Sequence, residues 1–194
     1  MNYTRLQQTN TPDLAPVYGG VRGRTMSARH QAFAWPALQE AGITTIIDLR
    51  ENDSTDRLSA ACERYGMRYF HYPVATSSEA VARMAELFPQ FCQLIDAGGF
   101  YIACAMGLHR TDIALNAYWL FYAADKGVQP PEIRGYRQED GRTTDKINRV
   151  LNALYATFTE RNGIEPMPQL LFKERKAVIT RQAQQNQSYT VSKD

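Results

Sequence analysis

A cysteine and an arginine enclose a short loop in this chain, with the sequence Cys104-Ala-Met-Gly-Leu-His-Arg110. A cysteine thiolate is a strong nucleophile, and a guanidinium group is a planar fork that binds two oxygens of one anion. Gly107 permits a tight turn, in which successive backbone N–H groups can converge on a single anion. The loop therefore predicts a nucleophile, Cys104, beneath an anion-binding cradle formed by the guanidinium of Arg110 and the backbone amides of Ala105, Met106, Gly107, Leu108, His109 and Arg110.

The segments on either side place this loop between a strand and a helix. Phe100–Cys104 is a short apolar run typical of a buried strand, and Arg110–Ala124 carries apolar residues on one helical face. Partial positive charge at the helix start stabilises both an anion and a thiolate. We expect the hydroxyl of Thr111 to hydrogen-bond the cysteine sulfur. The competing interpretation makes Cys104 a small buried hydrophobic residue. The glycine, the Arg-Thr pair and the following helix together favour the nucleophile.

The rest of the chain alternates between short apolar segments and amphipathic ones. The alternation predicts an α/β fold with a central, mainly parallel sheet flanked by helices. Ligands of such sheets bind beyond the carboxyl ends of the strands, where the loop would lie. The expected strands cover residues 17–21, 44–50, 67–74 and 100–104, and the expected helices cover residues 31–41, 56–65, 79–97, 110–124, 145–160 and 169–181.

Composition shifts divide the chain into three parts. Residues 1–16 form a polar N-terminal lead-in, and residues 17–162 contain the alternating strands and helices of one domain. Residues 163–194 are expected to hold a C-terminal helix and then a polar, disordered tail from about Gln182, because that composition can bury little apolar surface.

Charge and cysteine content exclude several classes of protein. Lys and Arg number 22 against 20 Asp and Glu in 194 residues, which argues against a nucleic-acid or membrane-surface binder. No apolar run approaches the roughly 20 residues of a membrane helix, and the polar N-terminus lacks the apolar core of a secretory signal. An odd, irregularly spaced cysteine set argues against a disulfide framework or a zinc site and suits a reducing cytoplasm: Cys62, Cys92 and Cys104.

The pattern C-x5-R-[ST] between a strand and a helix resembles the signature loop of the cysteine-dependent protein tyrosine and dual-specificity phosphatases. The resemblance covers roughly residues 17–125, because upstream segments follow the dual-specificity order: Val17-Tyr-Gly-Gly, then Gly42-Ile-Thr-Thr-Ile-Ile-Asp-Leu-Arg50, then Tyr65-Gly-Met-Arg-Tyr-Phe-His-Tyr-Pro-Val74. The Gly-x-His-Arg-Thr portion is also similar to atypical fungal and plant phosphatases, some of which act on inositol pyrophosphates.

This resemblance implies a dual-specificity-phosphatase-like fold and the hydrolysis of phosphate monoesters. Cys104 would attack phosphorus and form a cysteinyl-phosphate, while Arg110 and the loop amides would hold the equatorial oxygens. Thr111 would assist hydrolysis of that intermediate, and neither a metal nor another cofactor would be needed. The implied partners are a phosphoprotein, carrying phosphotyrosine, phosphoserine or phosphothreonine, or a small phosphorylated molecule such as an inositol phosphate.

The sequence departs from the family at three places. Ala103 stands where the family has histidine, and Leu108 removes a positive charge from the loop. The family's general acid, an aspartate after the Pro-Val strand, has no counterpart in residues 75–78. Glu79 is the nearest carboxylate, and we interpret it first as a favourable residue at a helix start. Other loop carboxylates that are candidate acids are Asp53, Asp56 and Asp140.

Two other classes of protein remain open at this point. Without a general acid, the loop could bind phosphate and barely turn it over, as in a phosphate-binding module or pseudophosphatase. A rhodanese-like sulfurtransferase also places a cysteine after a strand of an α/β sheet. Arginines after the Gly-Gly turn could line the entrance for a polyanion, but we interpret them as part of a solvated loop: Arg22, Arg24 and Arg29.

Overall fold

The computed structural model describes residues 1–9, 11, 13–25, 28–51, 55–135, 142–160 and 167–191. Two candidate acids from the sequence, Asp53 and Asp140, lie outside the described residues, as do the side chains of Arg29 and Asp56. The described chain forms two compact units, of which the first comprises Met1–Pro73 and Leu87–Thr111. The second comprises Val74–Glu86 and the chain from Asp112 onward.

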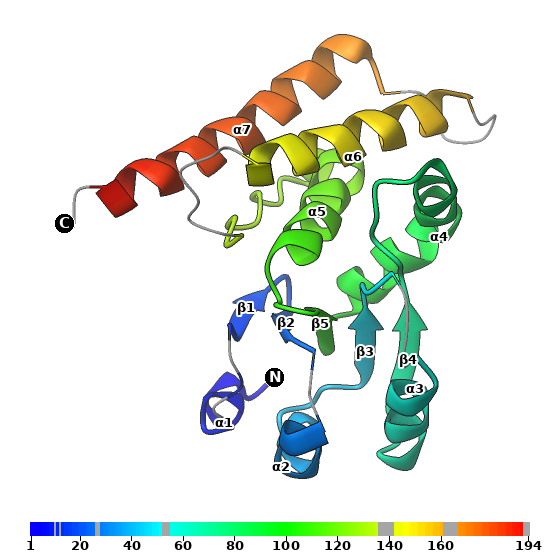
Figure 1. Cartoon of the computed structure of the whole chain (residues 1–194), viewed down its shortest axis with the longest axis vertical. Helices are drawn as coiled ribbons and strands as arrows, with labels where there is room; N and C mark the ends of the chain where they lie inside the picture. The colour runs from blue at the N-terminus through cyan, green and yellow to red at the C-terminus, as the bar shows by residue number, and fades with distance from the viewer. Residues whose placement is uncertain are drawn as a thin grey trace. The chain divides into compact units, whose positions relative to one another are not determined.

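A five-stranded sheet forms the centre of the first unit, with strand order β1-β2-β5-β3-β4 (Figure 1). β1 pairs with β2 in antiparallel fashion, and the pairs β2–β5, β5–β3 and β3–β4 are parallel. The α/β class predicted from the alternation, with its central and mainly parallel sheet, is therefore confirmed. The strands are β1 (Ala15–Val17), β2 (Gly20–Arg24), β3 (Thr45–Asp48), β4 (Arg68–His71) and β5 (Phe100–Cys104).

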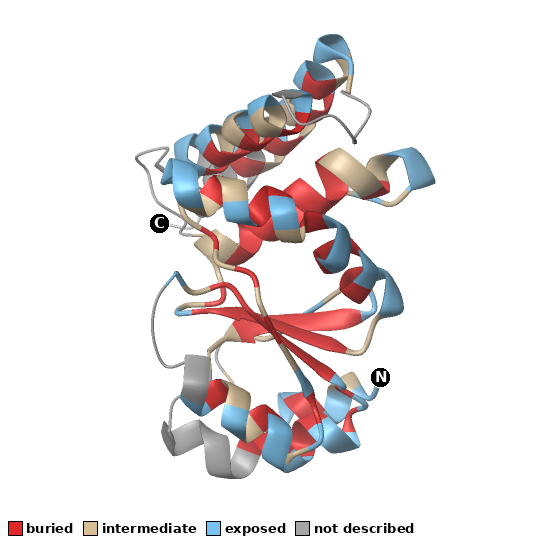
Figure 2. Cartoon of the chain, turned by 90° about the vertical axis from the view of Figure 1, so that its right-hand side faces the viewer, coloured by how far each residue is buried: buried red, intermediate tan, exposed pale blue. Residues whose placement is uncertain are grey.

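Helices α1 (Tyr3–Gln7), α2 (Ala28–Glu40) and α3 (Thr55–Arg64) pack on one face of this sheet. Their core residues join every second residue of the central strands, as the two-residue period of a strand requires. Figure 2 shows the central strands buried along their length. The polar lead-in takes part in this packing through the buried side chain of Leu6 and the partly buried side chains of Tyr3 and Leu14. The core cluster includes Leu6, Trp35, Leu38, Leu58, Ile46 and Tyr101.

Helix α4 (Ser78–Ala97) contributes residues to both units, and so does α5 (His109–Tyr118). In the second unit α5 continues as a π-helix over Trp119–Ala123 and a 3₁₀ turn over Ala124–Lys126. A single α-helix over 110–124 was expected there. The long helices α6 (Arg142–Glu160) and α7 (Gln169–Val191) follow.

The second unit is held together by aromatic side chains. Phe121 packs edge-to-face on Phe158 at 5.0 Å between ring centroids, and Tyr155 stacks on Phe172 at 4.2 Å. The segment expected to be a tail from Gln182 is helical as far as Val191, which corrects that expectation. Among the described ranges, no helix combines the length and the apolar character needed to cross a membrane.

Candidate active site

Cys104 lies at the carboxyl end of β5, the strand in the middle of the sheet. Its register partner on β2 is Arg24, and Asp48, the last residue of β3, lies opposite Ala103. The backbone bond from Thr25 N to the Cys104 carbonyl, at 2.9 Å, continues the pairing to the strand end. The loop predicted to carry the chemistry therefore begins where three parallel strands end together, which is the usual ligand-binding edge of such a sheet.

Gly107 turns the loop back toward β2. Its φ of +69° is strained for any residue with a side chain, and its N–H donates to the Cys104 carbonyl at 3.2 Å. A Cβ atom at this position would lie only 2.4 Å from the backbone carbon of Gly23. The loop thus packs directly on the β2 backbone, and only glycine fits. Because the Gly107 amide is used within the turn, it is the exception among the amides expected to bind an anion.

We expect Gly107→Ala to distort the loop. The added methyl group must displace the β2 backbone and must also adopt a positive φ, which together cost about 1–3 kcal/mol. The unfolding free energy from urea denaturation should fall by that amount. The variant should also bind inorganic phosphate more weakly than the parent protein does. Gly127→Ala is the control, since Gly127 also has a positive φ of 72° but open space around it. Normal phosphate binding by Gly107→Ala would contradict the close packing of loop and strand.

The hydroxyl of Thr111 donates to the sulfur of Cys104 at 3.5 Å, and both side chains are buried. This contact was expected from the sequence, and it places a hydrogen-bond donor against the sulfur. Cys62, by contrast, lies in the apolar core between the sheet and α3. Burial, with the nearby charge of Asp48, raises the pKa of the Cys62 thiol to about 12. Cys62 therefore stays protonated at neutral pH, which excludes it as the nucleophile.

Arg110, in the first turn of α5, carries a partly exposed guanidinium. Its Nη2 lies 3.7 Å from Oε2 of Glu51, a carboxylate that is half exposed. Such exposed ion pairs contribute little free energy, so the guanidinium can exchange this carboxylate for phosphate oxygens at small cost. Sequence reasoning missed Glu51. The available signal was its position directly after residues 44–50, the strand expected from the sequence.

A hydrogen-bond network fixes the end of β3 and the residues that follow it, which lead to Glu51. The fully buried carboxylate of Asp48 accepts from Nε and Nη2 of Arg50, at 2.9 and 2.7 Å, and from the Tyr69 hydroxyl at 3.1 Å. The ring of His71 contacts the Arg50 carbonyl at 2.7 Å. Asp48 thus holds Arg50 and Tyr69 at the end of β3, which is a structural role.

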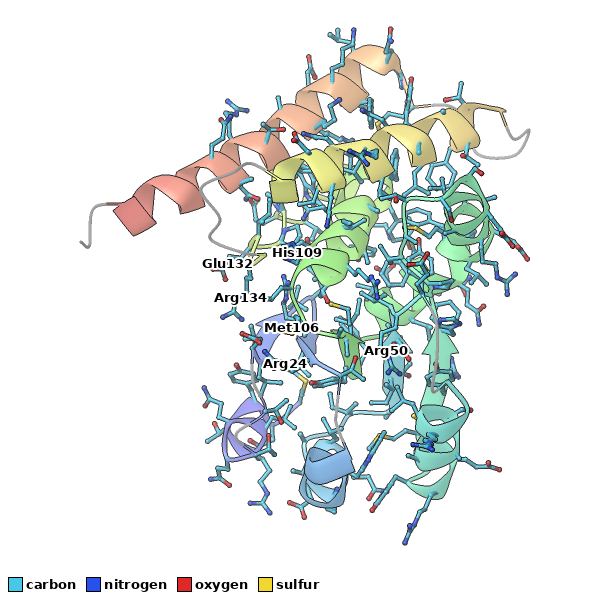
Figure 3. The ribbon with its side chains drawn as sticks, in the orientation of Figure 1. Arg24, Arg50, Met106, His109, Glu132 and Arg134 are labelled. Atoms are coloured by element: carbon cyan, nitrogen blue, oxygen red, sulfur yellow. The ribbon has the colours of Figure 1, made fainter. Side chains whose placement is uncertain are left out.

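Arg22 and Arg24 belong to β2, which corrects the expectation of a solvated loop after the Gly-Gly turn. Arg22 is only 2% exposed, and its Nη2 donates to the carbonyls of Gly107 at 3.0 Å and Leu108 at 3.3 Å. Arg24 is partly exposed at the strand end and pairs with Asp13 at 3.3 Å. Figure 3 labels Arg24 and Arg50 at the strand ends and Met106 in the loop.

Of the candidate acids, only Glu79 has a described side chain. It is exposed in the first turn of α4, where its charge favours the helix start, as we interpreted it from the sequence. It belongs to the second unit, whereas Cys104 belongs to the first. Within the described ranges, no three His, Cys, Asp or Glu side chains cluster as metal ligands would.

The second unit has a buried carboxylate directly after Thr111. The side chain of Asp112 is fully buried and accepts the backbone N–H groups of Arg134, at 3.2 Å, and Gly135. The Nε of Arg134 lies 3.8 Å from Glu132, and both residues are labelled in Figure 3. Asp112 therefore fixes the backbone of the segment after the 3₁₀ turn. This contact could not be predicted from the sequence, because the partners of Asp112 are main-chain groups.

No family model and no curated protein matches the chain. Several solved structures are similar to it, and three of them are described as phosphatases or phosphatase domains. A DUF442 protein of Shewanella putrefaciens CN-32, described as a candidate phosphatase, is 15% identical, with a TM-score of 0.48 and coverage of 91% of this chain and 97% of that one.

Two further structures give lower scores. The core catalytic domain of the PP-IP phosphatase SIW14 of S. cerevisiae is 12% identical, with a TM-score of 0.44 and coverage of 91% of this chain and 94% of that one. The Yvh1 phosphatase domain of Chaetomium thermophilum is 17% identical, with a TM-score of 0.40 and coverage of 84% and 92%.

Proposed function

We propose that this chain is a phosphatase that hydrolyses a phosphate monoester through a cysteinyl-phosphate intermediate, and that it is of the protein-tyrosine or dual-specificity type. One observation carries the proposal. Cys104 ends the central strand, receives a hydrogen bond from Thr111, and is followed by a tight loop that leads to Arg110 at a helix start. Nucleophile, anion-binding amides and guanidinium thus come from one continuous segment.

In the proposed first step the Cys104 thiolate attacks phosphorus, an S–P bond forms, and the P–O bond to the leaving group breaks. The departing oxygen takes a proton from an acid or from water. Arg110 and the loop amides hold the equatorial oxygens, because phosphoryl transfer depends mainly on positioning and charge stabilisation. In the second step water attacks phosphorus, the S–P bond breaks, and inorganic phosphate, a proton and the thiolate are released. Thr111 stabilises that departing thiolate.

The proposed substrates are phosphotyrosine, phosphoserine or phosphothreonine in a protein, or an inositol phosphate. All of these substrates carry a phosphate group. The guanidinium of Arg110 and the N-terminus of α5 would bind that group in each of them. A cytoplasmic location is part of the proposal. It is supported by the three cysteines, all of which are free thiols.

A catalytically weak phosphate-binding module is the second candidate. It is favoured by one observation, the absence of any carboxylate in residues 75–78, where the phosphatases have their general acid. In the described residues the carboxylate found beside Arg110 is Glu51, which contacts the guanidinium. The two candidates differ in whether activated aryl phosphates are turned over at all.

We expect turnover to depend steeply on the pKa of the leaving group. Phenols of low pKa depart without a proton, whereas alkyl groups need an acid. Activated aryl phosphates should therefore be cleaved, and phosphoserine should react slowly. A plot of log kcat/KM against leaving-group pKa across substituted phenyl phosphates measures this slope. No turnover of any aryl phosphate, together with tight phosphate binding, would support the binding module instead.

The variants Glu79→Gln and Glu51→Gln are the controls for this slope. Each replaces a carboxylate by an uncharged group of equal size, so each should leave the slope unchanged if neither is the acid. A shallow slope in the parent protein that becomes steep in one variant would identify that residue as the acid. A shallow slope in all three proteins would direct attention to Asp53, Asp56 and Asp140.

A further inference from the structure

Arg22 is a charged side chain in the interior of the first unit. It lies on β2, opposite Ile102 in the register, and only 2% of its surface is exposed. Burial of a guanidinium costs free energy unless its N–H groups find acceptors. Two of its acceptors are backbone carbonyls of the Cys104–Arg110 loop, those of Gly107 and Leu108, and both contact the same nitrogen, Nη2.

These two contacts fix the direction of two peptide groups. The described chain has no cis peptide bonds, and in a trans peptide the carbonyl and the following N–H point in opposite directions. Since the carbonyls of Gly107 and Leu108 are directed at Arg22, the N–H groups of Leu108 and His109 point away from it. Two successive amides then share one orientation, which is the requirement of an anion-binding nest.

We propose that Arg22 is a positioning residue of the oxyanion site: by holding two loop carbonyls, it aims the amides of Leu108 and His109 at the phosphate oxygens. Its charge also polarises these peptide groups and strengthens their N–H donors. The role rests on the proposed phosphatase function, because it assumes that the loop binds phosphate. Arg22 acts through the backbone and does not touch the substrate.

The test measures binding of inorganic phosphate by calorimetry to the full-length Cys104→Ser protein, with and without Arg22→Met. The added substitution removes the donors, and we expect phosphate to bind about 10-fold to 100-fold more weakly. The matched control is Arg175→Met. Arg175 is another buried arginine, in the second unit, and its Nη1 donates to the Leu120 carbonyl at 2.7 Å. Arg175→Met should lower stability without changing the phosphate Kd.

A second measurement avoids dependence on the folding of Arg22→Met. In ¹H–¹⁵N spectra of the Cys104→Ser protein, phosphate should shift the amide protons of Leu108 and His109 downfield, and Arg22→Lys should keep a large part of this response. Failure of the parent to bind phosphate would overturn the phosphatase proposal and this one with it. Normal phosphate binding by Arg22→Met, or phosphate shifts that spare Leu108 and His109, would overturn the role of Arg22 alone.

Discussion

Cys104→Ser should abolish turnover of aryl phosphates, with kcat lower by about 10⁴-fold to 10⁶-fold, the usual cost of removing a nucleophile. A serine hydroxyl is not ionised at neutral pH, whereas the thiolate is the reactive form of cysteine. The side chain is buried at the end of β5 and differs from serine by one atom, so the fold should survive. Steady-state assays with p-nitrophenyl phosphate measure the loss of turnover. Calorimetric titration with inorganic phosphate shows whether the folded site is retained.

The matched control is Cys62→Ser, which makes the same change at another buried thiol. Burial raises the pKa of Cys62 to about 12, so that thiol has no part in the reaction and kcat should stay near the parent value. Both variants must be assayed well below their unfolding midpoints, because serine is less favourable than cysteine in an apolar core. Retained activity in Cys104→Ser would move the chemistry to another group.

Arg110→Lys should have the second largest effect. Lysine keeps the positive charge but loses the planar fork that binds two phosphate oxygens at once. We expect kcat to fall by about 10²-fold to 10³-fold, the usual cost of losing a group that stabilises the transition state. KM should change less, because the remaining charge still attracts the substrate. Single-turnover kinetics with p-nitrophenyl phosphate separate the chemical step from binding.

Arg24→Lys is the control for that substitution. Arg24 is also an arginine at the carboxyl edge of the sheet, and it is held by Asp13 at 3.3 Å rather than by the loop. Arg24→Lys should therefore lower kcat far less than Arg110→Lys does. Equal losses of kcat in the two variants would contradict the specific role of Arg110. They would mean that catalysis requires only positive charge at the carboxyl edge of the sheet.

The central strand and its loop could be predicted from sequence because their signals are local. A short apolar run after two glycines defines β5 over Phe100–Cys104, with the bounds that the structure shows. The contact between Thr111 and Cys104 was also predictable, because the start of a helix necessarily lies close to the end of the strand that leads into it. Local patterns therefore sufficed to place Cys104 at the strand end and to place Arg110 and Thr111 at the helix start.

The partners of the loop could not be predicted, because they come from distant parts of the chain. Arg22 contacts Gly107 across 85 positions, and its own segment, Gly-Val-Arg-Gly-Arg, has two glycines and only one β-branched residue, Val21, which is a poor composition for a strand. Pairing with β5 makes it a strand despite that composition. Likewise Arg175 donates to the Leu120 carbonyl of the π-helix after α5 from 55 positions away.

The central claim is that the phosphoryl group is transferred to the sulfur of Cys104 before water releases it. Trapping this covalent intermediate tests the claim most directly. The full-length protein would be mixed with excess aryl phosphate and quenched in acid within the first turnovers. It would then be digested and analysed by mass spectrometry. We predict a phosphoryl group on the peptide that contains Cys104, absent from Cys104→Ser treated in the same way. Turnover at the normal rate with phosphate on no cysteine peptide, or on the peptide of Cys62 or Cys92, would contradict the mechanism.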